Sequence, residues 1–259
     1  MKHKEVINYI VSWLVDYSAK SHTSGFVIGI SGGIDSALTS TLCALTQKPV
    51  IALNMPIRQH KAEFDRSAEH IEWLKKNYAN VTSDAVNLTH IFEKIESDFP
   101  VSIQDFLTMA NTRARLRMLT LYAFAGHHKM LVAGTGNKIE DFGVGFFTKY
   151  GDGGVDISPI ADLLKSQVYG LAKELNVVES ILQAKPTDGL FADGRSDEDQ
   201  MGATYDELEW AMLALEKRVN EKQFSEREKQ VMEIYKSRNR ANKHKMEAIP
   251  VCKIPKELL

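Results

Sequence analysis

The chain of 259 residues has few cysteines, no long apolar run and no excess of one charge. Its two cysteines, Cys43 and Cys252, are too few for a disulfide framework or a four-thiolate zinc site. Lysine and arginine number 32 against 34 acidic residues, so the net charge of −2 excludes the broad basic surface of a non-specific nucleic-acid binder. No run of roughly 20 apolar residues that could cross a bilayer is present. These absences predict a cytoplasmic protein with free thiols that binds neither nucleic acid nor membrane.

Short apolar runs alternate with helical patterns along the first half of the chain. Runs of this kind, bounded by glycine or proline, are typical of buried parallel strands. We expect an α/β fold, a Rossmann-like parallel sheet with helices on both faces and further C-terminal helices, forming a single domain over residues 1–259. The predicted strands are 25–30, 50–55, 84–88 and 130–133, and the predicted helices are 6–15, 35–45, 60–77, 102–125, 162–175, 205–217 and 225–239.

The sharpest chemical signal is Ser31-Gly32-Gly33-Ile34-Asp35-Ser36, which follows one predicted strand and opens a predicted helix. In that setting, backbone N–H groups and the helix dipole hold an anion. The sequence is not a Walker loop, because no lysine follows the glycines. Asp35 stands there instead, and a carboxylate is a poor neighbour for phosphate unless a metal ion lies between them.

These six residues resemble the pyrophosphate loop of the N-type ATP pyrophosphatases, which cleave ATP between its α- and β-phosphates and transfer AMP to a substrate oxygen. The resemblance implies ATP binding by Gly29, Ile30, Ser31, Gly32, Gly33, Ile34, Asp35 and Ser36. The loop does not distinguish among the members of that superfamily.

The middle of the chain does distinguish among them. Residues 134–140, 145–156, 164–168 and 185–188 are similar to the signature of the NAD synthetase family, and 113–118 fit the same family. The resemblance implies ATP-dependent amidation of deamido-NAD (nicotinic acid adenine dinucleotide) to NAD through an adenylated intermediate, with release of AMP and pyrophosphate. The ammonia-dependent form is implied, because no amidotransferase domain accompanies the synthetase motifs.

The same resemblance implies roles for residues on the ATP side. Asp35 and Glu140 would ligate Mg²⁺, which takes one or two carboxylates together with phosphate oxygens and water. Lys165, Thr135 and Thr187 would bind ATP, and the Lys165 ammonium would offset charge on the departing pyrophosphate. The segment after Glu140 is one residue longer than in the family form that carries Gly-Thr-Asp-His in this loop.

On the second-substrate side, the family resemblance implies deamido-NAD binding by Arg115, Lys149, Asp156, His244 and Lys245. The last two lie in a segment that we interpret as a basic tail, and the resemblance implies that they reach the ligand across a homodimer interface. Asp152 is our candidate to bind ammonium and accept its proton; the alternative is an aspartate that only shapes a turn. The predicted catalytic set is therefore Asp35, Glu140, Lys165 and Asp152.

Residues 185–202 combine proline, glycine and acidic residues without apolar periodicity, which predicts an irregular, mobile lid that excludes water. Two alternatives to an NAD synthetase are a tRNA-modifying member of the superfamily and a non-catalytic nucleotide sensor. The former needs a basic RNA-binding surface or extension. The latter has no need of Glu140, Lys165 and a lid together.

Overall fold

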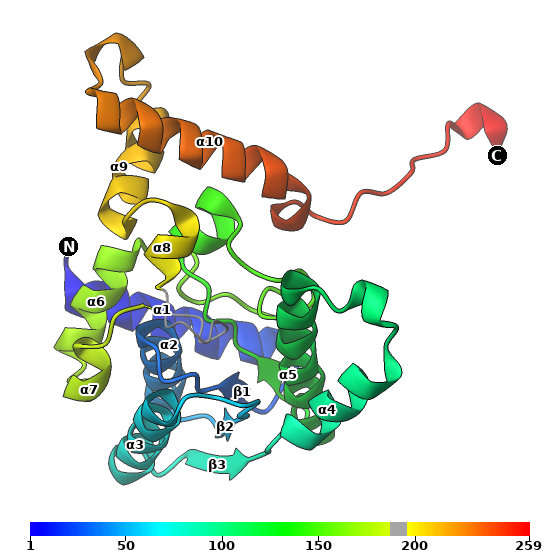
Figure 1. Cartoon of the computed structure of the whole chain (residues 1–259). Coiled ribbons are helices and arrows are strands. Elements are labelled where there is room, and N and C mark those ends of the chain that lie inside the picture. Colours follow the sequence, from blue (N-terminus) through cyan, green and yellow to red (C-terminus); the bar gives the residue numbers. More distant parts are fainter. Residues whose placement is uncertain (187–195) are drawn as a thin grey trace.

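A parallel four-stranded sheet forms the centre of the molecule, as predicted (Figure 1). The computed structural model describes residues 1–186 and 196–259. The strands are β1 (Phe26–Gly29), β2 (Val50–Asn54), β3 (Val81–Ala85) and β4 (Leu131–Val132), in the order β3-β2-β1-β4. Successive strands turn to opposite sides of β1, so the loops after β1 and β4 border the crevice where parallel sheets bind ligands.

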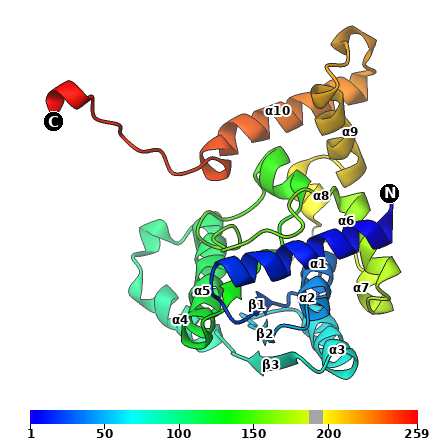
Figure 2. The same ribbon diagram turned by 180° about the vertical axis from the view of Figure 1, so that it is seen from behind.

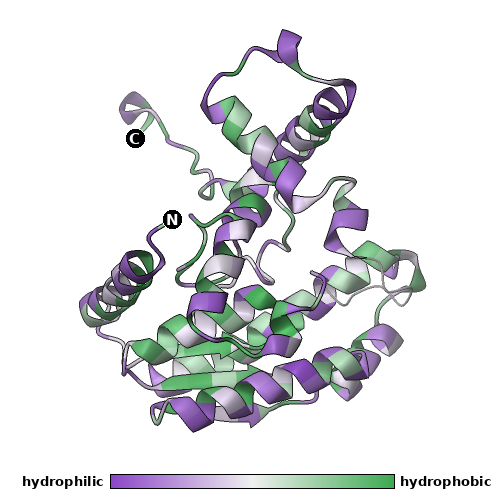
Figure 3. Cartoon of the chain, turned by 90° about the vertical axis from the view of Figure 1, so that its left-hand side faces the viewer, coloured by the Kyte–Doolittle hydropathy of each residue, from purple (hydrophilic) through white to green (hydrophobic). Residues whose placement is uncertain are grey.

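Alternate residues of the strands face two separate hydrophobic clusters. Phe26 and Ile28 pack with α1 (His3–Lys20), α2 (Ile34–Leu45), α3 (Lys61–Asn77), α6 (Lys165–Glu174) and α7 (Glu179–Leu182). Val27 faces the other way, towards α4 (Thr89–Asp98) and α5 (Phe106–His128). β1, β2 and β4 are covered on both faces and are largely apolar, as the hydropathy colouring shows (Figure 3).

A third cluster joins the C-terminal helices to the centre of the chain (Figure 2). It contains α8 (Asp197–Met201), α9 (Tyr205–Glu216), α10 (Glu226–Met246) and a π-helix, η2 (Ile139–Val144). A π-helix carries an additional residue per turn, which suits the longer segment after Glu140. The described residues also form three short 3₁₀ helices, η1 (Val101–Ile103), η3 (Glu221–Gln223) and η4 (Lys256–Leu258).

Side chains of α10 satisfy the carbonyls of this irregular segment. The Asn239 amide donates to the carbonyl of Gly143 at 2.8 Å, and the Asn242 amide donates to that of Val144 at 2.8 Å. Lys245 Nζ donates to the carbonyls of Gly145 and Phe147. The last turns of α10 therefore hold η2 in place.

Three predictions about the elements were wrong, and three helical segments were missed. The third strand begins three residues earlier than predicted, because β3 is an edge strand whose largely exposed Thr82-Ser83-Asp84 stretch lacks an apolar pattern. Helices α4, α7 and η2 were not predicted. The predicted irregular segment 185–202 contains α8, which begins at a capping box on Ser196. The predicted basic tail is helical up to Met246, and only the residues after it extend away from the body (Figures 1 and 2).

Cys43 is buried and Cys252 exposed, and both are free thiols as predicted. Within residues 1–186 and 196–259, no helix has the combination of length and hydropathy needed to span a membrane.

Candidate active site

The loop between β1 and α2 is fastened by its own two serines. Ser31 and Ser36 hydroxyls lie 3.0 Å apart, the Gly33 N–H donates to Ser31 Oγ, and Ser36 Oγ donates to the Gly33 carbonyl. The N-cap of α2 is Gly33, which has no side chain to cap the helix. The first N–H groups of α2 therefore have no capping side chain, which is the arrangement that an anion site at a helix start requires.

Glycine is required at position 32. Its φ of +87° is in the left-handed region, and a Cβ there would lie 2.6 Å from the Glu63 carbonyl oxygen. The loop thus packs closely against the first turns of α3, which brings that helix to the phosphate site.

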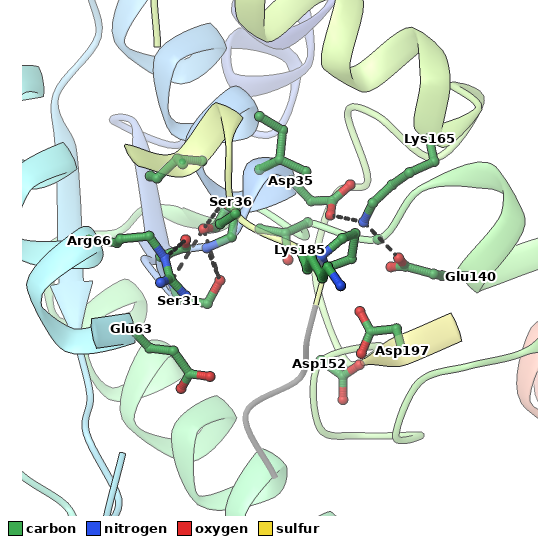
Figure 4. Close-up of a pocket in the computed structure, with 18 of the residues that line it drawn as sticks. Ser31, Asp35, Ser36, Glu63, Arg66, Glu140, Asp152, Lys165, Lys185 and Asp197 are labelled. Atoms are coloured by element: carbon green, nitrogen blue, oxygen red, sulfur yellow. Dashed lines mark hydrogen bonds and ion pairs between the residues drawn. The ribbon is translucent and has the colours of Figure 1, made fainter. Parts of the chain in front are cut away.

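Three predicted residues from different elements converge beside the loop (Figure 4). Lys165 Nζ, at the first residue of α6, lies 2.5 Å from Asp35 Oδ2 and 3.0 Å from Glu140 Oε1. Lys165 is 3% exposed. Burial alone lowers its pKa, but the two carboxylates outweigh burial and raise the pKa of Lys165 above its ordinary value. For Asp35 the balance is the reverse, because burial raises its pKa more than Lys165 lowers it.

Two further side chains orient these carboxylates. The buried Asn137 donates from its amide to Asp35 Oδ1 at 3.1 Å, while its carbonyl accepts from the backbone N–H groups of Ile139 and Glu140. Tyr205, the first residue of α9, donates its hydroxyl to Glu140 Oε1 at 2.6 Å. Asn137 thus joins the metal-ligand candidate on α2 to the start of η2.

The surrounding cavity has a volume of about 200 Å³. Among the described residues, its lining has six carboxylates, including Asp141 and Asp152, against three cations. Desolvation, and then the neighbouring carboxylate of Glu140, raise the pKa of Asp141 to about 8. Desolvation raises the pKa of Asp152 in the same way, although its side chain opens towards the cavity. A nucleotide triphosphate needs an additional cation to enter such a pocket.

The donor set fits Mg²⁺. Asp35 and Glu140 already converge on one cationic atom, Lys165 Nζ, and two carboxylates are the protein contribution that Mg²⁺ takes alongside phosphate and water. In the described part of the chain, no group of three or more His, Cys, Asp or Glu side chains could hold a metal ion. Such a group would favour an all-protein cage, which Mg²⁺ does not require.

A larger cavity of about 820 Å³ adjoins the first. Ser31, Thr135 and Asp152 line both, so the cavities meet above the loop. One side is apolar, with Met55 and Leu121 beside Gly29. Met55 thus reaches this side of the cavity, while Leu53 on β2 is fully buried.

The other side of this cavity is basic. It brings together Arg115, Lys149, His244 and Lys245, all predicted for deamido-NAD. Arg115 Nε donates to the Lys149 carbonyl at 3.3 Å, and Lys149 Nζ donates to the His244 carbonyl at 2.7 Å. His244 and Lys245 reach this cavity from their own chain, on the last turn of α10.

Two predicted residues are not brought to the cavities as described. Asp156 accepts from the Tyr122 hydroxyl at 2.9 Å and from the Val132 backbone N–H at 2.8 Å, and it is not in the described lining of either cavity. Thr187 lies outside the described residues, as does half of the predicted lid, residues 187–195. Of that segment, Lys185, Pro186 and Asp197 line the smaller cavity, and the Asp197 N–H donates to the Pro186 carbonyl at 3.2 Å.

The sequence is similar to known proteins along most of its length. The sequence model of the NAD synthase family matches residues 6–249. The chain belongs to the NAD synthase family. It is 42% identical over 201 residues to the NH(3)-dependent NAD(+) synthetase of Mycoplasma genitalium, covering 76% of this chain and 78% of the relative. It is 39% identical over 213 residues to that of Alkaliphilus metalliredigens, covering 78% and 83%.

Solved structures in this family have the same fold. NMN synthetase from Francisella tularensis superimposes with a TM-score of 0.86 at 32% identity, covering 98% of this chain and 100% of that one. The NH3-dependent NAD synthetase from Campylobacter jejuni gives 0.80 at 26% identity, with 98% and 100% covered. Membership confirms the predicted activity, an ATP-dependent, ammonia-using ligase of NAD biosynthesis, rather than a tRNA-modifying enzyme or a nucleotide sensor.

Proposed function

We propose that the chain amidates deamido-NAD in two steps where the two cavities meet. In the first step, a nicotinate carboxylate oxygen attacks the α-phosphorus of ATP, the bond from that phosphorus to the β-bridging oxygen breaks, and pyrophosphate leaves. In the second step, ammonia attacks the activated carbonyl carbon, AMP leaves with the acyl oxygen, and one proton is released. Activation is needed because a carboxylate oxygen is a very poor leaving group.

The smaller cavity takes the triphosphate. We assign Gly29 to Ser36 and Thr135 to ATP, with the loop N–H groups on the departing pyrophosphate, and we keep the predicted contact of Thr187. Asp35 and Glu140 would hold Mg²⁺, which when bound screens the phosphate charges. The lysine between them, Lys165, neutralises the carboxylates and donates to phosphate oxygens as negative charge builds on the leaving group.

The larger cavity takes the dinucleotide. The guanidinium of Arg115 and the ammonium groups of Lys149 and Lys245 supply positive charge for two phosphates and a carboxylate, and His244 adds a ring on the same turn. Asp156 remains a proposed deamido-NAD residue, although its side chain accepts from the Val132 backbone N–H. Because His244 and Lys245 line their own chain's cavity, the proposed homodimer is not needed to bring them there.

Asp152 is proposed to bind ammonium and take its proton. Its carboxylate lies at the junction of the cavities and accepts from the Thr148 backbone N–H at 3.0 Å, which aims it. Its raised pKa makes it a better base than an ordinary aspartate, as ammonium activation requires.

The observation that carries this proposal is the convergence of Asp35, Glu140 and Lys165 beside the glycine loop. The test is pyrophosphate release by the purified chain with ATP, Mg²⁺, ammonium and deamido-NAD, with NAD and AMP identified by mass spectrometry. Equal amounts of NAD, AMP and pyrophosphate are expected. Pyrophosphate release without NAD would contradict the amidation step.

The same assay should also test nicotinate mononucleotide as the acid substrate. The Francisella tularensis structure is that of an NMN synthetase, and this chain matches it over nearly its full length. Nicotinate mononucleotide lacks the adenylate half that would occupy more of the large cavity. We expect a higher kcat/KM with deamido-NAD; a higher value with the mononucleotide would reassign the substrate. Light scattering of the same preparation measures whether the chain is a homodimer.

A further inference from the structure

A second cation lies beside the glycine loop, on the side away from Lys165. Arg66 is on the second turn of α3 and is half-buried. Its Nε donates to the Gly32 carbonyl at 3.3 Å, and it lines the same cavity as the loop. Figure 4 shows Arg66 and Lys165 on opposite sides of Ser36 and Asp35.

Lys165 and Arg66 differ in how many ion-pair partners they have. Lys165 is shared by two carboxylates. Among the described residues, Arg66 has no salt bridge within 4.0 Å, and its one hydrogen bond uses Nε and leaves both terminal nitrogens. Glu63, one turn earlier on α3, lines the cavity as well, but forms no ion pair with Arg66 in the described chain.

We propose that Arg66 binds the β- and γ-phosphates of ATP and the pyrophosphate that leaves. This inference deepens the proposed function and rests on it. The guanidinium fork donates two parallel hydrogen bonds to phosphate oxygens, and its charge offsets the excess of carboxylates in the cavity. As the bond between the α-phosphorus and the bridging oxygen breaks, negative charge moves onto the pyrophosphate, and Arg66 stabilises it from the side opposite Lys165.

Arg66 also ties the loop to α3, so the test must separate phosphate binding from loop support. Arg66→Gln keeps an N–H donor for the Gly32 carbonyl and removes the charge. Arg66→Lys keeps the charge and removes the fork. The matched control is Arg58→Gln, because Arg58 is exposed, pairs with Glu93 and Glu96, and is not among the described lining of either cavity.

The direct readout is calorimetric titration of each variant with inorganic pyrophosphate and Mg²⁺, without the acid substrate. For Arg66→Gln we expect about 10–100-fold weaker pyrophosphate binding and a similar rise in KM for ATP, with KM for deamido-NAD and the melting temperature unchanged. Arg66→Lys should bind pyrophosphate roughly 3–10-fold more weakly than the wild type. Arg58→Gln should match the wild type.

Wild-type affinity in a folded Arg66→Gln would overturn the assignment, and so would a loss of melting temperature without a loss of pyrophosphate affinity. If Arg66→Gln does not fold, Arg66→Lys decides alone: unchanged pyrophosphate affinity overturns the proposal. Failure of the wild type to bind pyrophosphate at all would instead overturn the proposed function of the loop.

Discussion

Asp35→Asn is the most direct test of the site, because it removes one charge and almost no volume. Asp35 makes two contacts of opposite kinds: Oδ2 accepts from Lys165 at 2.5 Å and Oδ1 accepts from Asn137 at 3.1 Å. In the variant, the remaining side-chain oxygen still accepts from one of these two donors, and the new NH₂ group faces the other. Lys165 keeps Glu140 as a partner, so it is not left unpaired in the interior.

The stability change should therefore be small. The variant loses an ion pair, but it also avoids the free-energy cost of burying a charged carboxylate. That cost is evident in the wild type, where burial raises the pKa of Asp35. We expect the free energy of unfolding to change by no more than about 2 kcal/mol. Activity should fall much further, by about 10²–10³-fold in kcat/KM or roughly 3–4 kcal/mol of transition-state stabilisation, since the carboxylate is proposed to hold Mg²⁺.

Pyrophosphate release at saturating Mg²⁺ measures the rate, and Mn²⁺ binding followed by electron paramagnetic resonance measures the metal site without turnover. The matched control is Asp162→Asn, whose side chain is 98% exposed and lies 3.5 Å from Lys138 at the surface. A folded Asp35→Asn variant with near wild-type turnover and metal affinity would refute the reasoning.

Three further predictions follow from other groups. Tyr205→Phe removes the donor at 2.6 Å from Glu140 and should weaken Mn²⁺ affinity about 5–10-fold while the fold is retained; unchanged affinity would show that the hydroxyl does not orient this carboxylate. Burial lowers the pKa of His70 from 6.5 to about 4, so folding leaves it neutral, and stability present above pH 6.5 should be lost as pH falls towards 4, by about 2 kcal/mol at pH 5. Urea unfolding of His70→Gln should lack that part of the loss, with exposed His60→Gln as control; parallel curves for His70→Gln and wild type would contradict it. Ammonium should be used directly, with the rate rising between about pH 7 and 9 and glutamine giving almost nothing; equal rates with both donors, in a preparation free of glutaminase, would overturn this.

The loop from Ser31 to Ser36 was predictable because its geometry is local. A buried strand, a positive φ that only glycine adopts easily and an uncapped helix start all lie within eight residues. The apolar runs that form β1 and β2 were predictable for the same reason. Edge strand β3 was misplaced because most of its residues are exposed and its central residues, Thr82, Ser83 and Asp84, are polar.

The joining of Asp35 to Lys165 depends on tertiary structure. These residues are 130 positions apart, and in the sequence only the resemblance to a family connects them. The roles of Asn137 and Tyr205 could not be predicted from the sequence. Asn137 lies within the recognised motif without a role of its own, and the pattern around Tyr205 indicates only the first residue of a helix. Their roles come from where η2 and α9 meet.

The contacts between α10 and η2 define where this protein can be shortened. The segment after Met246 stands clear of the body, so trimming it or extending it with an affinity tag leaves the proposed metal-ligand pair untouched (Figure 1). Cutting earlier, before Asn239, strips the donors from the carbonyls of residues 143–145 and 147, at a cost of about 1–3 kcal/mol for each one left unpaired. Glu140 is on that same segment. The minimal catalytic unit therefore extends to the end of α10, more than 100 residues beyond the carboxylate that α10 holds in place.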